Sequence, residues 1–408
     1  MNEASTSPPQ PAGLDPAAGA AGATGPRRWP VRFSGSGSEY FRIWIVNLLL
    51  TLVTLTLYYP WAKVRKLRYF YGNTEVAGHA LDFHGEPSRM MRGYLLVGAL
   101  FLVYSVAGRF SAVAGVVALV AVAVLWPLLF RASMRFRLAQ TSWRGLRLQF
   151  AGDTAGAYKA LLPAYLPAVF VLAVVSYLAA DQNGAAGQVA ADAAGSASAP
   201  LLAMLGAMLC VPLIWWALKR YQHGHYRLAG VQTRFTASVP SFYGLFLKAL
   251  LVSVAAGAAV AVLAGLISGA GLLALLGGGG RSTGAVVVAA VIGMLALYAA
   301  LLLVVYPYFV SRLQNLVWSR TESPAVGFDS NLRWRPLLGL TLKNWLLVLL
   351  TLGLYWPFAA VALAKLKLEA VTVVAHEDLD TLVAGRREAM KDASGEAAAD
   401  LFDIDLGL

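Results

Sequence analysis

Charged side chains are scarce in this sequence. Asp, Glu, Lys and Arg make up 13% of its 408 residues, while apolar residues make up 58%. A soluble globular domain carries about 25% charged residues. Several apolar runs also reach the length that crosses a bilayer, which is about 20 residues. The composition therefore argues against a soluble protein and predicts an integral membrane protein.

Cysteine is almost absent. Cys210 is the single cysteine and lies within an apolar run, which excludes a disulfide framework and a cysteine-rich metal site. His223 and His225 have the spacing of a chelating pair, but no Asp, Glu or Cys lies nearby in sequence to complete a metal site. No nucleotide-binding, nucleophile-elbow or zinc-protease motif occurs in the context that it requires. We therefore expect no enzyme, with no catalytic residues, no metal and no cofactor.

Acidic residues are missing from the eight long apolar runs. Proton-relay and sodium-coupled carriers usually place carboxylates at membrane depth. Their absence argues against both classes and leaves passive or anion permeation open. The runs cover residues 41–59, 93–111, 112–130, 158–180, 201–218, 243–276, 285–308 and 337–358.

Basic residues give the chain a net charge of +12, and they gather in four loops between the runs, with 19 there against 2 in the other connections. The positive-inside rule places these four loops in the cytoplasm. It explains the charge without nucleic acid as a partner. The basic stretches also suit anionic lipid headgroups, and the candidate contacts are Lys63, Arg65, Lys66, Arg68, Arg131 and Arg135.

The basic loops share a pattern. In three of them a proline is followed fourteen residues later by a threonine, and all four end in Phe followed by small or polar residues. The first part of each loop has a helical pattern and the second alternates with the period of a strand, with Gly78 and Gly145 at turn positions. We interpret each loop as an interfacial helix followed by a β-hairpin; the alternative is coincidental composition. The threonines are Thr74, Thr141 and Thr321, and the Phe positions are 83, 150, 235 and 328.

A second repeat links the two ends of the chain. Residues 54–62 match residues 351–359, and Asn47 matches Asn344 at the same offset of 297. An asparagine inside an apolar run needs hydrogen-bond partners. The candidate intramembrane polar site therefore comprises Asn47, Asn344, Thr54 and Thr351. The alternative is that both asparagines face headgroups at the interface.

The orientation of the two terminal runs is ambiguous. Arg32-Phe33-Ser34-Gly35 resembles the ends of the cytoplasmic hairpins, which would put residues on both sides of run 41–59 in the cytoplasm. That run would then enter the membrane and return as two half-helices, and run 337–358 would do the same. Such backbone is tolerated where protein or a cavity surrounds it. We favour six spans plus two re-entrant segments over eight full spans with both termini outside.

These patterns predict an all-α polytopic membrane protein with six to eight transmembrane segments, internal repeats and short cytoplasmic β-hairpins between the segments. We expect a disordered tail over residues 1–29, because that stretch is rich in Pro, Ala and Gly. The repeat-built transmembrane domain covers residues 30–370. A flexible or cytoplasmic tail follows over residues 371–408.

The opening of the transmembrane domain resembles the YjgN family of bacterial inner-membrane proteins, which is defined by a domain of unknown function. The resemblance extends over about residues 30–370 and implies residence in the bacterial inner membrane, with no established activity. Thr54-Leu55-Thr56 departs from the family's usual Thr-Leu-Gly, which Thr351-Leu352-Gly353 keeps. The resemblance rests on Glu39-Tyr40-Phe41-Arg42-Ile43-Trp44, Asn47-Leu48-Leu49-Leu50, Pro60-Trp61-Ala62-Lys63-Val64-Arg65 and Gly72-Asn73-Thr74.

Two functions follow from the sequence. Paired broken segments at a central cavity would transport or conduct an unknown small solute. Basic, aromatic-bearing surface helices would instead serve a scaffold that organises envelope or lipid. An intramembrane enzyme is the weakest alternative, because no cluster of titratable groups is visible. The sequence does not define an oligomeric state.

Single-cysteine labelling will test the orientation. With Cys210 replaced, we expect cysteines at Ser36, Gly72 and Ser394 all to react from the cytoplasmic side, because re-entrant segments leave both termini inside. Reaction of the Ser36 and Ser394 positions from outside, with Gly72 inside, would establish eight plain spans instead.

Overall fold

The computed structural model describes residues 25–183, 193–276 and 301–385, together with residues 291, 293–295, 298, 299 and 388. Three expectations lie partly or wholly outside these residues. They are the N-terminal tail up to residue 24, the apolar run 285–308, and the C-terminal tail beyond residue 388.

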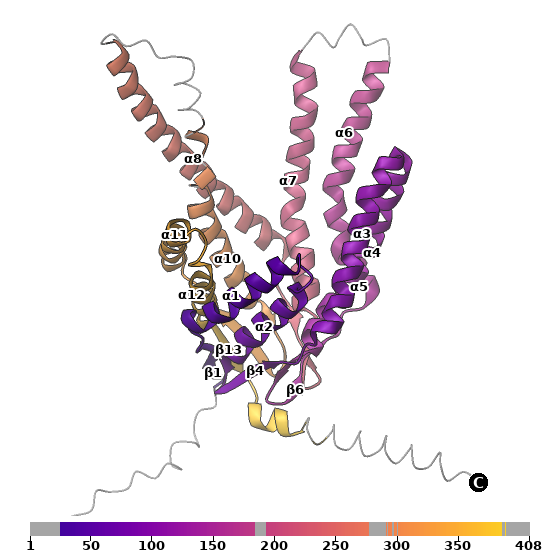
Figure 1. The fold of residues 1–408 in the computed structure, drawn as a ribbon, viewed down its shortest axis with the longest axis vertical. Coiled ribbons are helices and arrows are strands. Elements are labelled where there is room, and N and C mark those ends of the chain that lie inside the picture. Colours follow the sequence, from indigo (N-terminus) through magenta and orange to yellow (C-terminus); the bar gives the residue numbers. More distant parts are fainter. Residues whose placement is uncertain are drawn as a thin grey trace, which may run out of the picture.

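The chain is mainly helical and is built from five successive units, each a helical part followed by short strands (Figure 1). The first unit contains α1 (Gly37–Val53) and α2 (Tyr59–Gly72), and the second contains α3 (Pro87–Phe110) and α4 (Ala112–Ala139). The third contains α5 (Thr154–Leu161), η1 (Leu162–Tyr165), α6 (Leu166–Asn183) and α7 (Ala193–His223). The fourth contains α8 (Val239–Leu276), the π-helical turn η3 (Leu301–Val305) and α10 (Tyr306–Trp318), and the fifth contains α11 (Trp334–Leu350) and α12 (Trp356–Glu369).

Five helical stretches are long and apolar enough to cross a membrane among the residues that the structure describes. Their side chains are largely exposed, as expected for helices that face lipid. The short helices α1, α2, α11 and α12 are not among them. The structure is therefore that of a polytopic membrane protein, while the count of six to eight segments stays a prediction. The five stretches are Pro87–Phe110, Ala112–Ala139, Thr154–Val174, Ala203–His223 and Val239–Val262.

The strands form three antiparallel sheets with the orders β1-β13-β12-β11-β10, β2-β3-β4-β5-β6 and β7-β8-β9. The strands of the first two units are β3 (Thr74–Val76), β4 (His79–Phe83), β5 (Thr141–Trp143), β6 (Leu146–Arg147) and β7 (Gln149–Phe150). The next two units add β8 (Tyr226–Leu228), β9 (Val231–Gln232), β10 (Arg234–Phe235), β11 (Thr321–Glu322) and β12 (Val326–Ser330). The chain ends supply β1 (Arg27–Pro30), β2 (Arg32–Phe33) and β13 (Val371–Ala375).

Together the three sheets form a closed ring. Single residues join β1 to β2, β6 to β7 and β9 to β10, so each of these three segments leaves one sheet and enters the next. The first and last strands, β1 and β13, pair antiparallel and close the circle. Because every unit pairs with both of its neighbours, the ring leaves no unit with an open edge.

Each unit joins the next through an equivalent backbone hydrogen bond. The last strand before each helical part is here called the outer strand, and the first strand after that helical part is called the inner strand. The residue that follows an outer strand donates its N–H to the carbonyl that precedes the next inner strand, at 2.8–3.0 Å in all five places. The inner strand then starts fourteen residues after a buried proline in every unit. The five bonds run from Ser34 to Asn73, His84 to Gln140, Ala151 to His225, Thr236 to Arg320 and Asn331 to Ala370.

The strand register and the strand bounds correct three sequence predictions. The fourth unit reaches its joint at Ser330, which pairs with Val371, and not at Phe328. Side chains along a strand point to the same face of the sheet at every second residue, so a shift of two positions leaves the sequence pattern unchanged. The predicted C-terminal tail also starts too early, because residues 371–375 form β13 and residues 379–385 are helical. At the other end, β1 starts at Arg27, within the predicted N-terminal tail.

A glycine at the joint will test this geometry. A Cβ on Gly152 would lie 2.6 Å from Cε1 of Phe150 and 2.7 Å from the Tyr221 hydroxyl. Overpacking of this kind costs about 1–3 kcal/mol, so Gly152→Ala should lower the midpoint of thermal unfolding in detergent. Gly98→Ala is the control, because nothing lies within 4 Å of that Cβ. Equal midpoints for both variants would contradict the assigned packing.

Candidate functional site

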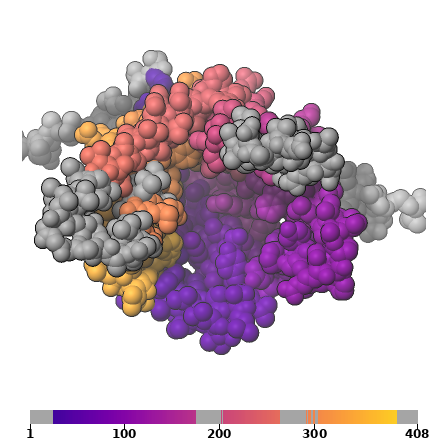
Figure 2. All heavy atoms as spheres, turned by 90° about the horizontal axis from the view of Figure 1, so that it is seen from above, coloured from indigo at the N-terminus to yellow at the C-terminus, as the bar shows by residue number. Residues whose placement is uncertain are grey.

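Seen from above, the molecule is hollowed at its centre, with the units arranged around the hollow (Figure 2). Figure 1 shows the long helices of the second, third and fourth units rising from the strand ring and spreading apart. The strand ring therefore forms the narrow end of the structure, and the hollow opens away from it.

All five units contribute apolar side chains to one cluster at this narrow end, here called the floor cluster. Buried members are Trp143, Leu146 and Ala375, joined by Leu379 and Val383 from the chain's last described helix. Partly buried members come from the first four units. They include Val76, Leu148, Leu228 and Val326. Because all five units of the ring contribute to it, this cluster links them at the narrow end.

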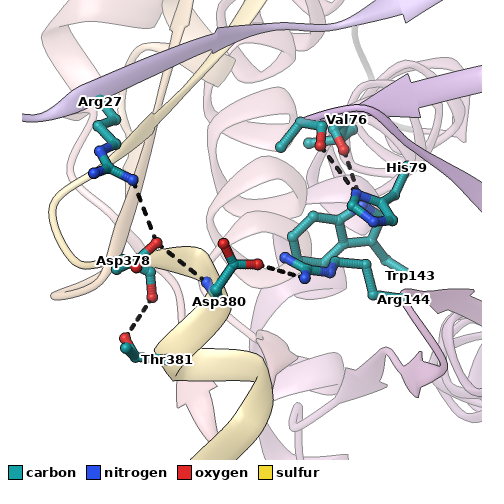
Figure 3. Close-up of polar contacts among 9 residues, drawn as sticks. Arg27, Val76, His79, Trp143, Arg144, Asp378, Asp380 and Thr381 are labelled. Atoms are coloured by element: carbon teal, nitrogen blue, oxygen red, sulfur yellow. Dashed lines mark hydrogen bonds and ion pairs between the residues drawn. The ribbon is translucent and has the colours of Figure 1, made fainter. Parts of the chain in front are cut away.

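Residues 378–385, here called the C-terminal segment, complete the floor cluster. Figure 3 shows the ion pairs that Asp378 and Asp380 of this segment make with Arg27 and Arg144. The Asp378 carboxylate lies 3.6 Å from the guanidinium of Arg27, on β1. The Asp380 carboxylate lies 2.5 Å from that of Arg144, in the turn between β5 and β6. These ion pairs therefore tie the segment to two different units.

Burial dominates the stability of this contact. Leu379 and Val383 retain 7% and 2% of their exposure, and burying such side chains contributes about 1.5–3 kcal/mol each. Both ion pairs include a partner that is well exposed, and pairs of that kind contribute about 0–1 kcal/mol. The apolar side chains therefore hold the segment in place, and the ion pairs set its orientation.

The predicted polar residues lie in two helix pairs with the same bounds at the offset of 297: α1–α2 and α11–α12. Thr54 and Thr351 have the same structural role. Each hydroxyl donates to the carbonyl four residues earlier, at 2.7 Å, and accepts the N–H four residues later, at 3.0 and 2.9 Å. The two threonines thus cap the turn between the helices, and their hydroxyl hydrogens are not available to a solute.

Asn47 and Asn344 are both buried, at 7% exposure. The Asn47 amide oxygen accepts a bond from Arg65 at 3.5 Å, within the first helix pair. The Asn344 amide donates to the Ala359 carbonyl at 3.4 Å, and its oxygen is buried with no hydrogen-bond partner among the described residues. Helix α1 packs against α12, but each asparagine bonds inside its own pair. The structure therefore forms two separate polar positions.

Both helix pairs begin and end at the strand ring. Phe33, just before α1, pairs with Thr74, just after α2, and Ser330 pairs with Val371 in the same way around α11 and α12. The turns at the far ends are apolar and open, with Leu55 84% and Leu352 94% exposed. Each pair therefore goes out from the ring and returns to it.

The predicted headgroup contacts divide into two groups. Arg68 and Arg131 donate to the carbonyls of Gly85 and Gly152, at 3.1 and 2.8 Å. Each bond holds the backbone in place where the chain leaves the last strand of that unit. Trp216 and Asn315 make the same bond in later units, a role that the sequence did not reveal because the residue types differ. The guanidinium of Arg65 and the ammonium groups of Lys63 and Lys66 lie over rings of their own helix or its N-cap, at 5.7–6.0 Å, and Arg135 is exposed.

The histidine pair makes two different contacts. His223 is buried and its Nδ1 lies 3.1 Å from the Thr321 hydroxyl of the next unit. His225 Nδ1 lies 2.8 Å from the carbonyl of Tyr221, on α7. Next to them, burial raises the pKa of Tyr226 to about 12, so this tyrosine stays neutral at physiological pH. His223 therefore lies at the joint between the third and fourth units, whereas His225 and Tyr226 lie at the joint between the second and third units.

Comparison with known proteins agrees with this picture of a membrane protein. The model of a family described as bacterial protein of unknown function (DUF898) matches residues 28–401. The inner membrane protein YjgN of Escherichia coli K12 is 34% identical over 124 residues, 29% of this chain and 30% of its own. YjgN of E. coli O157:H7 is 30% identical over 129 residues, 31% of this chain and 32% of its own. The aligned stretches thus span about a third of these relatives, and no solved structure matches the chain.

Substitution of one leucine will test how the C-terminal segment is held. Leu379→Asp removes the buried side chain and places a carboxylate in the floor cluster, where an unpaired charge is costly. We expect hydrogen exchange across residues 378–385 to become about 100-fold faster. Ala384→Asp adds the same charge at an exposed position of the same helix and should leave exchange unchanged. A segment that exchanges equally fast in both variants is not held by Leu379.

Proposed function

Since the chain belongs to the DUF898 family of bacterial proteins of unknown function, we propose that it resides in the inner membrane and lets a small solute pass through its central hollow. The inner-membrane names of its relatives support the location. The closed ring of five units around a hollow is the observation that carries the permeation pathway.

In the proposed orientation the strand ring faces the cytoplasm. The basic loops counted in the sequence include the ring strands and the helix ends beside them, and positive charge next to membrane spans favours the cytoplasmic side. The five long apolar stretches then cross the bilayer, and a sixth span comes from the fourth unit. We also infer that the five units are copies of one repeat, because their joint bonds and buried prolines occupy equivalent positions.

The two short helix pairs are re-entrant in this proposal. Each leaves the ring and returns to it, and each exposes leucines at its far turn, where lipid chains would surround them. At 17 residues, α1 and α11 are each about 25 Å long, which is short of the hydrocarbon thickness of about 30 Å. Asn47 and Asn344 then lie at membrane depth as candidate polar positions beside the pathway.

The floor cluster is the closed gate of the pathway. Its side chains are apolar, and a narrow apolar constriction blocks ions by excluding water. Basic residues around the ring favour anions as the permeating species. In this proposal the C-terminal segment keeps the gate shut by completing the cluster.

Flux measurements with two truncations will test this proposal. A chain that lacks residues 378–408 loses Leu379 and Val383, whereas a chain that lacks residues 386–408 keeps them. We expect proteoliposomes with the shorter chain to admit iodide, measured by quenching of an enclosed fluorophore, at least about tenfold faster than those with the longer chain. Vesicles with the full-length protein should be as tight as those with the chain that lacks only residues 386–408. Vesicles that stay equally tight with both truncations would contradict a pathway closed by this segment.

A scaffold that organises lipid is the second candidate. The observation in its favour is the pair of exposed leucine turns, which would perturb the bilayer without opening a route across it. Tight vesicles in the flux assay, together with lipid ordering that depends on Leu55 and Leu352, would support this function.

A further inference from the structure

We propose that the pocket at the start of α11 binds a phosphate-bearing anion. This binding site is independent of the permeation pathway. The pocket has a volume of about 500 Å³, and its polar lining comprises Arg312, Asn315, Asn331, Arg333 and Arg335, with Trp334 beside them.

The charge of the pocket is uncompensated. Three guanidinium groups line it and no acidic residue does. None of the three arginines takes part in an ion pair within the described part of the chain. Arginine pairs with phosphate through two parallel hydrogen bonds, a geometry that also gives specificity. An anionic group with several oxygens is therefore the ligand that this lining fits.

Aromatic rings hold two of the three arginines that line the pocket. The Arg312 guanidinium lies 5.7 Å from the centre of the Tyr308 ring, and that of Arg335 lies 5.8 Å from the Trp334 ring. The two rings meet edge to face, with centres 6.4 Å apart. Stacking of this kind positions a guanidinium without neutralising it. Its N–H groups remain available to a ligand.

The backbone adds donors at the same place. Helix α11 has Arg333 as its N-cap, with no side-chain capping bond. The N–H groups of Trp334 and Arg335 precede the first intrahelical bond and point toward the positive end of the helix dipole. Two other units fill this position themselves: Ser36 caps α1 and Asp153 caps α5, whereas α3 also lacks a side-chain cap. The start of α11 combines free backbone donors with three arginines, which is a favourable arrangement for phosphate.

Apolar surface continues from the pocket along α11. Leu342, Trp345 and Leu346 are 52%, 57% and 55% exposed. A phospholipid whose headgroup occupied the pocket would have room for its acyl chains beside this helix. A free phosphate would use the same arginines without that surface. Both ligands present a phosphate group to the arginines, and the lipid-binding experiment below distinguishes them.

Lipid binding will be measured by native mass spectrometry of the full-length protein. The probes are dioleoyl phosphatidylglycerol, dioleoyl phosphatidylcholine and inorganic phosphate. The test variant is Arg312→Gln with Arg335→Gln, and the matched control is Arg147→Gln with Arg234→Gln, which removes two exposed strand arginines. We expect the test variant to retain phosphatidylglycerol about tenfold less than wild type, and the control to match wild type.

The outcomes separate cleanly. If phosphatidylglycerol binds and phosphate does not displace it, the ligand is a lipid headgroup. If phosphate alone binds and depends on Arg312 and Arg335, the pocket serves a free anion. Equal retention by test and control variants overturns the proposal. A single Arg333→Gln variant repeats the comparison if the double variant does not fold. Failure of the flux assay leaves this result unaffected, because binding is measured without transport.

Discussion

The whole architecture depends on the pairing of the first strand with the last. Residues 27–30 pair in register with residues 372–375, and this pairing of strands turns five units in a row into a ring. Each unit alone has two or three short strands, which are marginally stable in water. Closure gives every unit two neighbours, so the ring is stabilised as a whole, and the centre of the molecule becomes a defined place where five units meet.

The centre of the ring is apolar, while its joints are polar. The joints use backbone bonds that any residue supplies, braced by a side chain whose type changes from Arg68 to Trp216 to Asn315. The floor cluster instead needs particular apolar side chains, because Leu379 and Val383 must fit among residues from all five units. The joints therefore tolerate variation, and the floor depends on a few positions.

Much of this fold was predictable from the sequence, and the exceptions have physical reasons. The spacing from Pro60 to Thr74 and the offset between Asn47 and Asn344 marked equivalent positions, and the family assignment was confirmed. The proline-to-threonine spacing marked only three of the five units, because Tyr226 and Val371 stand where the others have threonine. The register at Ser330 was ambiguous by two residues, and the partner of β13 lies some 340 residues earlier in the chain. Arg68 and Arg131 looked like headgroup contacts because sequence shows charge but not the carbonyl that a side chain reaches.

The order of synthesis has a consequence for the fifth unit, because its strands β13 and β1 come from opposite ends of the described chain. Strand β1 is made early, and the ring cannot close until its partner β13 has been made. Until then the four units between them form an open arc, and the floor cluster lacks Ala375, Leu379 and Val383. Closure of the ring therefore requires synthesis to reach at least Ala375, and a chain that stops before β13 leaves strand edges unpaired.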